Sequence, residues 1–284
     1  MTIFESIVLA IVEGLTEFLP ISSTGHLVIA QALMGIESTE YVKAFTVMIQ
    51  FGAILSVVVL YYKRFFCFDL PSDMWHGDHS ELRRTLSRFR FYFLLVVGVV
   101  PAAILGLLFN NWVDKALGEV WIIAANLLVG GVIMLFIDRL LKHATTTAVT
   151  YPKAFIIGFF QTIAMFLPGM SRSMCTIVGG MTTGLKRDVA AEFSFFLAVP
   201  TMLGASVLEI IKFAKSGNMA VLSDNIVTLI IGNVVSFIVA LVAIKTFIKY
   251  LQKHGFVAFG IYRIIIGGVI LAMLGLGMDL AVFS

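Results

Sequence analysis

Six apolar segments, each long enough to cross a lipid bilayer, limit the fold of this chain more than any other feature of its sequence. They lie at about residues 42–62, 91–109, 120–140, 191–211, 226–247 and 256–278. A transmembrane helix needs about 20 mainly apolar residues. Because 60% of the 284 residues are hydrophobic and only 13% are charged, no soluble globular class fits. The sequence therefore predicts an all-α polytopic membrane protein, with residues 1–284 forming a single integral membrane domain.

The basic residues indicate which side of the membrane each loop faces, since lysine and arginine concentrate in cytoplasmic loops. The longest polar stretch, residues 63–90, holds Lys63, Arg64, Arg83, Arg84, Arg88 and Arg90. We therefore expect a cytoplasmic position for 63–90, 139–153, 186–187 and 245–254, and an outer position for 110–119, 212–225 and both termini. Lys212 and Lys215 are the only basic residues that mildly contradict this arrangement.

Other features of the sequence exclude several classes of site and partner. The net charge of +3 is too small to suggest a nucleic-acid partner. The N-terminal apolar stretch lacks a basic n-region, so we do not interpret it as a cleaved signal peptide. Cys67 and Cys175 lie in unlike settings and are expected to be free thiols, without a disulfide or a metal. The loop residues His76, Asp78 and His79 are expected to be solvated.

A shorter apolar segment at the N-terminus is predicted to enter the membrane and turn back. As a helix, residues 3–18 would reach only about 24 Å at ~1.5 Å per residue, whereas the hydrocarbon core is roughly 30 Å thick. Pro20 prevents extension of this helix. Irregular backbone at membrane depth is tolerated only where protein or a water-filled cavity surrounds it, so we expect a functional site at this turn.

The sequence also contains an internal repeat, found by shifting it by 148 positions. The shift places the Phe-Leu-Pro of residues 18–20 on that of residues 166–168, and Ser23 on Ser171. With three spans in each half, we expect an inverted repeat of residues 1–143 and 152–280, whose two re-entrant helical hairpins meet near the midplane. Chance similarity between apolar segments is the alternative.

Residues 13–26, E-G-L-T-E-F-L-P-I-S-S-T-G-H, gather polar groups in a chain that otherwise avoids them. Glu13 and Glu17 share one helix face, where their charges repel unless a cation lies nearby. We expect them to hold a hard divalent cation, Mg²⁺ or Ca²⁺. Two alternatives remain open, namely a polar helix face turned to water and a general base.

The hydroxyl residues that follow Pro20 favour an anion site. Ser22, Ser23 and Thr24 can each cap a second helix, whose free N–H groups would face an anion. His26 lies four residues after Ser22 and could accept a proton from that hydroxyl. A hydrogen-bonded structural histidine is the alternative.

Residues 168–176, P-G-M-S-R-S-M-C-T, form the corresponding turn of the second half. Gly169 frees the backbone, and hydroxyls come from Ser171, Ser173 and Thr176. Arg172 adds a permanent charge whose planar guanidinium suits two phosphate oxygens. The alternative is an arginine that extends to the membrane interface or bonds to helix carbonyls.

A further arginine, Arg263, lies in the last span. A charge within the membrane is costly and therefore suggests a function. We interpret Arg263 as either a second anion contact or the partner of a buried acid such as Glu192.

Both motifs resemble the signature motifs of the undecaprenyl-diphosphate phosphatase family of bacterial inner membranes, often called the bacitracin-resistance family. The resemblance runs the whole length of the chain and includes E-F-S-F-F-L-A-V-P at 192–200 and Y-R at 262–263. Met174 and Cys175 stand where small residues are commoner in the family. The resemblance implies a metal-dependent hydrolase that removes the terminal phosphate of undecaprenyl diphosphate, which recycles the lipid carrier of cell-wall synthesis. The matching functional positions are Glu13, Glu17, Ser23, His26 and Arg172.

These residues suggest a mechanism, because phosphoryl transfer depends mainly on positioning and on neutralising charge. The cation held by the two glutamates would bridge pyrophosphate oxygens, while Arg172 and the hydroxyl-rich turns clamp them. Either Ser23 attacks with His26 as base, or His26 activates water. The polyprenyl tail would stay in the bilayer between spans, and a homodimer is compatible with this arrangement. The alternative is a carrier that flips a lipid phosphate or moves an anion, since inverted repeats are common in transporters.

Overall fold

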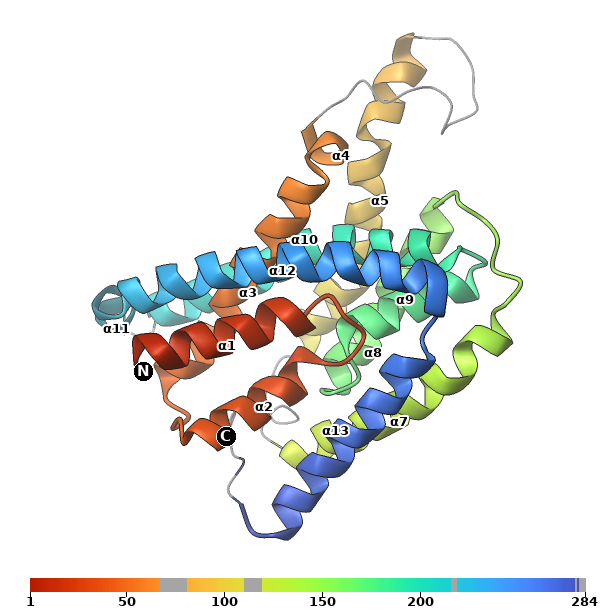
Figure 1. The fold of residues 1–284 in the computed structure, drawn as a ribbon. Coiled ribbons are helices and arrows are strands. Elements are labelled where there is room, and N and C mark those ends of the chain that lie inside the picture. The colour runs from red at the N-terminus through yellow and green to blue at the C-terminus, as the bar shows by residue number, and fades with distance from the viewer. Residues whose placement is uncertain (67–80, 110–118, 216–218, 279, 281–284) are drawn as a thin grey trace.

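The computed structural model describes residues 1–66, 81–109, 119–215, 219–278 and 280, and these parts of the chain fold into twelve helices (Figure 1). The helices are α1 (Ile3–Thr16), α2 (Ser23–Met34), α3 (Glu40–Leu60), α4 (Tyr62–Phe66), α5 (Glu81–Leu108), α7 (Val120–Leu140), α8 (Tyr151–Phe166), α9 (Arg172–Thr182), α10 (Arg187–Lys215), α11 (Met219–Asp224), α12 (Ile226–His254) and α13 (Val257–Gly275). Within the described ranges the β-type pairing is limited to one isolated bridge, between Thr146 and Leu185. The predicted all-α class is confirmed.

Six of these helices are long and apolar enough to cross a membrane. They are α3, α5 through its part Phe89–Leu108, α7, α10, α12 and α13. They coincide with the six segments predicted from the sequence, so the chain is a multi-pass membrane protein. Large apolar side chains such as Leu107, Leu140 and Val242 are exposed on their surfaces, as lipid-facing residues should be. Cys67, His76, Asp78 and His79 lie outside the described residues, whereas Cys175 is a buried free thiol as expected.

Two pairs of shorter helices, α1 with α2 and α8 with α9, are each joined by a tight turn. Ser22 caps α2 and Ser171 caps α9, and each hydroxyl accepts a bond from the N–H three residues later. Both serines have a positive φ, 70° for Ser22 and 74° for Ser171. Such angles cost a non-glycine residue on the order of 1–3 kcal/mol. Contacts from outside the turns must therefore hold them in this shape.

The geometry of the turns pairs Ser22 with Ser171, whereas the shift of 148 positions places Ser23 on Ser171. The difference arises because the second turn reads P-G-M-S and the first reads P-I-S, one residue shorter. Arg172 in the second turn consequently occupies the position that Ser23 has in the first. The first residue of α2 is therefore a hydroxyl, and the first residue of α9 is a cation.

The two halves of the chain interlock. The short helix α1 packs along α12, and α8 packs along α5, so each lies against a long helix of the other half (Figure 1). The α8–α5 approach needs glycine, since a Cβ at Gly158 would lie 2.0 Å from the carbonyl oxygen of Gly98. Small residues allow membrane helices to pack this closely. The interlocking encloses both turns, and the turn side chains Phe18 and Met170 belong to one apolar core together with Met174 of α9.

Candidate active site

The carboxylate of Glu17 joins the two turns. Ser23, at the start of α2, donates its hydroxyl to Glu17 Oε2 at 2.6 Å. Arg172, at the start of α9, donates from Nη2 and Nε to Glu17 Oε1 at 3.0 and 3.3 Å. The side chains of Glu17 and Arg172 are 8% and 14% exposed. A charge-assisted pair shielded from water in this way is strong and geometrically well defined, so it fixes the turns relative to each other.

Arg172 has N–H donors that no described residue of the chain accepts. Its Nη1 donates to the carbonyl oxygen of Ser194 on α10 at 3.3 Å, and its Cζ lies 5.9 Å from the centre of the Phe18 ring. A guanidinium has five N–H groups. Three of them make the bonds described, which leaves two for the oxygens of a bound anion.

Glu13 lies one helical turn before Glu17 and is completely buried. Neither of its carboxylate oxygens has a hydrogen-bond partner among the described residues. A buried carboxylate without a partner is costly. No cluster of three or more His, Cys, Asp or Glu residues occurs in the described ranges. Mg²⁺, however, is commonly held by one or two carboxylates together with water and substrate phosphates. Glu13 and Glu17 therefore fit such an ion.

His26 uses both of its ring nitrogens within the protein. Nδ1 lies 2.7 Å from the carbonyl oxygen of Ser22, and Nε2 lies 2.8 Å from the hydroxyl of Tyr262, whose ring stacks on the imidazole. Because a carbonyl only accepts, Nδ1 carries the proton, and in the neutral ring Nε2 accepts from Tyr262. The expected bond to the Ser22 hydroxyl is thus replaced by one to the Ser22 carbonyl.

The remaining hydroxyls predicted to contact phosphate differ in position. Ser22 and Ser171 cap their helices, and Thr24 lies partly exposed in the first turn of α2. Ser173 and Thr176, by contrast, are fully buried. Ser173 donates to the carbonyl oxygen of Leu19 at 2.8 Å, and the Thr176 hydroxyl lies 2.6 Å from that of Ser194. These two buried hydroxyls connect the start of α9 to the first turn and to α10.

Arg263 differs from both of its predicted roles. Its side chain is completely buried, and its nitrogens donate to four backbone carbonyl oxygens, those of Pro20, Asn126, Leu127 and Gly169. Glu192, the acid suggested as its partner, interacts with Tyr61 and Arg64 instead. A buried guanidinium needs acceptors for its fixed array of donors, and the backbone provides them here.

Three residues of this region were not predicted from the sequence: Tyr262, Ser194 and Asn126. Tyr262 and Ser194 lie within the stretches Y-R and E-F-S-F-F, which already stood out, so their neighbours could have identified them. Asn126 donates to the carbonyl oxygen of Pro168 at 2.8 Å. In the sequence, Asn126 was marked only by being the single amide side chain in the apolar span α7.

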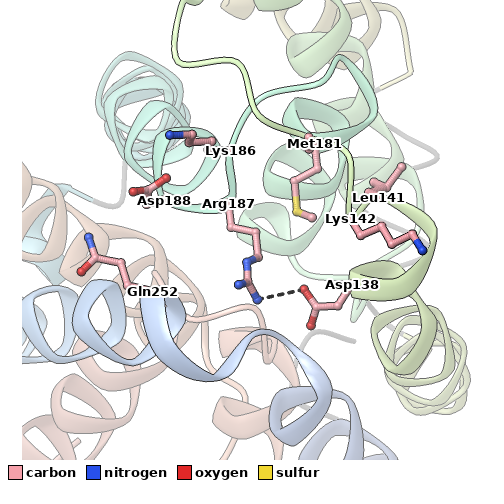
Figure 2. Close-up of a pocket in the computed structure, with 9 residues that line it drawn as sticks. Asp138, Leu141, Lys142, Met181, Lys186, Arg187, Asp188 and Gln252 are labelled. Atoms are coloured by element: carbon pink, nitrogen blue, oxygen red, sulfur yellow. Dashed lines mark hydrogen bonds and ion pairs between the residues drawn. The ribbon is translucent and has the colours of Figure 1, made fainter.

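A cavity of about 620 Å³ lies away from these residues, at the ends of α7, α9, α10 and α12 (Figure 2). Arg187 and Asp138 form an ion pair of 3.2 Å inside it. The ammonium ends of Lys142 and Lys186 point away from this pair on opposite sides (Figure 2). The cavity therefore offers no convergent charges comparable to those around Glu17.

Named proteins of several bacteria are similar to this chain over nearly its whole length. A relative in Porphyromonas gingivalis, named undecaprenyl-diphosphatase, is 56% identical over 283 residues, which cover 99% of this chain and 100% of the relative. Proteins of the same name in Flavobacterium psychrophilum and Bdellovibrio bacteriovorus are 51% and 44% identical and cover 95% and 99% of both chains. Residues 6–269 match the family described as bacitracin resistance protein BacA. At this identity and coverage, the chain belongs to the BacA family.

Proposed function

We propose that this chain hydrolyses the phosphoanhydride bond of undecaprenyl diphosphate, releasing undecaprenyl phosphate and inorganic phosphate. The observation that carries the proposal is the junction of both turns at Glu17, which brings a hydroxyl and a guanidinium onto one carboxylate. The relatives named undecaprenyl-diphosphatase, at 44% to 56% identity over nearly the whole chain, support it. The reaction recycles the lipid carrier and is the basis of bacitracin resistance in this proposal.

Ser23 is the proposed nucleophile. Its oxygen attacks the terminal phosphorus, its proton passes to Glu17, and the bond to the bridging oxygen breaks, so that undecaprenyl phosphate leaves. Water then hydrolyses the phosphoserine and releases phosphate. The 2.6 Å bond from Ser23 to Glu17 supports Glu17 as the base in place of His26, whose nitrogens bond elsewhere. The two unused N–H groups of Arg172 would bind the oxygens of the transferring phosphoryl group.

A divalent cation, Mg²⁺ or Ca²⁺, is the proposed cofactor, with Glu13 and Glu17 as its protein ligands. When bound, it supplies positive charge to the diphosphate oxygens. Glu13 lies on α1, and Glu17 is the C-cap residue of that helix with helical backbone angles, so the last helical turn sets the spacing of the two carboxylates. The buried, unpartnered oxygens of Glu13 are the observation that supports this part of the proposal.

Purified protein in detergent should release inorganic phosphate from undecaprenyl diphosphate, and a chelator should abolish the release. Excess Mg²⁺ or Ca²⁺ should restore it, whereas the same concentration of Na⁺ should not. Full activity in chelator would contradict the metal site. Binding of the lipid without any release would favour the second candidate, a lipid-phosphate carrier, which the interlocked halves with their short hairpins also suit.

We further propose that α1–α2 and α8–α9 are re-entrant hairpins of an inverted repeat in the bacterial inner membrane, with both termini on the outer side. Both turns come from one chain, so the site does not require a homodimer.

A membrane-impermeant maleimide tests this topology. It should label Thr2→Cys in intact spheroplasts, and label Lys142→Cys only after permeabilisation. Wild-type protein, with its own cysteines, is the background control. If Lys142→Cys alone were labelled in intact spheroplasts, the orientation would be the opposite of the one proposed.

A further inference from the structure

Arg263 connects three segments that are far apart in the sequence. From the middle of α13 it donates Nη1 to the carbonyl oxygen of Pro20 at 3.2 Å, in the first turn. Nη2 donates to the carbonyl oxygen of Gly169 at 2.9 Å, in the second turn, and to that of Asn126 at 3.2 Å, on α7. Nε donates to the carbonyl oxygen of Leu127 at 3.4 Å. One buried cation thus bonds to both turns and to a span.

The surroundings of this guanidinium are shaped to fit it. A Cβ at Gly130, on α7, would lie 2.2 Å from Arg263 Nη2, so any side chain there would displace the guanidinium. Gly169 has a φ of +91°, and a Cβ there would lie 2.3 Å from the carbonyl oxygen of Ile123. Asn126 also holds the second turn through Pro168. Together α7 and α13 form a support against which the second turn rests.

The two turn carbonyls lie at matching places relative to the ion pair. Pro20 is three residues after Glu17, and Gly169 is three residues before Arg172. Both turns contain a strained serine, so they need contacts from outside to keep their shape. We propose that Arg263 is a positioning residue for the reaction, which holds both turns in the register that lets Arg172 reach Glu17. This inference rests on the proposed function.

The arrangement separates Arg263 from direct contact with substrate. Its side chain is completely buried, and four of its five N–H groups bond to backbone oxygens. Disturbing it should therefore alter the alignment of Glu17, Ser23 and Arg172 without removing a substrate contact. A misplacement of about 1 Å in an active site can lower the rate on the order of 100-fold. We expect such a loss in kcat, with KM changed less than about threefold.

Two variants test the proposal by different routes. Arg263→Lys keeps the charge but removes the planar array of donors. Gly130→Ala keeps the arginine but displaces its guanidinium. Gly268→Ala, on α13, is the matched control because a Cβ there meets nothing within 4 Å. Both test variants should lose about 100-fold in kcat, while Gly268→Ala should retain the wild-type value. Phosphate release from undecaprenyl diphosphate in detergent gives kcat and KM, and size-exclusion chromatography gives the folded fraction.

A double-mutant cycle with Arg172→Lys separates positioning from a general effect on the fold. If Arg263 acts by aligning Arg172, the loss caused by Arg263→Lys should be much smaller when Arg172→Lys is already present. If the double variant lost the product of the two single-variant losses in kcat, the proposal would be overturned. A kcat within threefold of wild type in both test variants would overturn it as well. Failure of both test variants to fold would also overturn it, by making Arg263 a residue of the fold alone. An inactive wild-type protein would refute the proposed function itself.

Discussion

Glu17→Gln is expected to lower kcat for phosphate release by about 10⁴-fold, the upper end of the range for loss of a general base. Glutamine has nearly the same shape, but it has no charge to hold Arg172 and no basic oxygen to take the proton of Ser23. The substitution thus weakens the contact between the turns and removes the base in a single step. Phosphate release measured with saturating undecaprenyl diphosphate and Mg²⁺ gives the value.

Glu209→Gln is the matched control for this variant. Glu209 is another glutamate on a membrane helix, α10, and it lies 3.9 Å from Lys212 in an ion pair within one helix. Exposed pairs of this kind contribute little to stability, so kcat should stay within about twofold of wild type. Glu17→Gln protein that is folded and keeps more than a tenth of wild-type kcat would contradict the role assigned to Glu17.

The helices that cross the membrane could be predicted from the sequence because length and hydrophobicity define them locally. An apolar run such as 120–140 has to span the bilayer whatever its neighbours are. The short segment ending before Pro20 was also recognisable, since its length is measurable on the sequence. The charges of Glu17 and Arg172 marked the candidate site for a similar reason, because ionisable groups in apolar segments rarely lack a function.

The contacts that organise the site could not be predicted in the same way. The partners of Arg263 are backbone carbonyls, which every residue has, so no sequence pattern marks them. The register of the turns depends on one additional residue before Ser171, a difference that a shift by a fixed number of positions cannot represent. The partner of His26 is Tyr262, 236 residues away in the chain. These features arise from tertiary packing and became visible only with the fold.

Ser23→Ala and His26→Gln should differ strongly, and the difference identifies the attacking group. Ser23→Ala removes the oxygen that bonds to Glu17, so kcat should fall by at least about 10⁴-fold if that oxygen attacks phosphorus. His26→Gln should lower kcat only on the order of 10- to 100-fold, because His26 bonds to Ser22 and Tyr262 and orients the start of α2. In the structure Ser23, and not His26, contacts Glu17, the proposed base.

Tyr262→Phe is the matched control, since it removes only the hydroxyl that His26 accepts from. If His26 were the base, His26→Gln would lose about as much kcat as Ser23→Ala, whereas Tyr262→Phe, which leaves Nε2 free to accept a proton, would lose little. If Ser23 attacks and Glu17 takes the proton, Tyr262→Phe should stay within about tenfold of wild type. Rapid quenching with substrate labelled in its terminal phosphate adds a direct readout, because a Ser23 nucleophile leaves the label on the protein before release. A loss in His26→Gln as large as that in Ser23→Ala, with no label on the protein, would instead establish water as the nucleophile and His26 as its base.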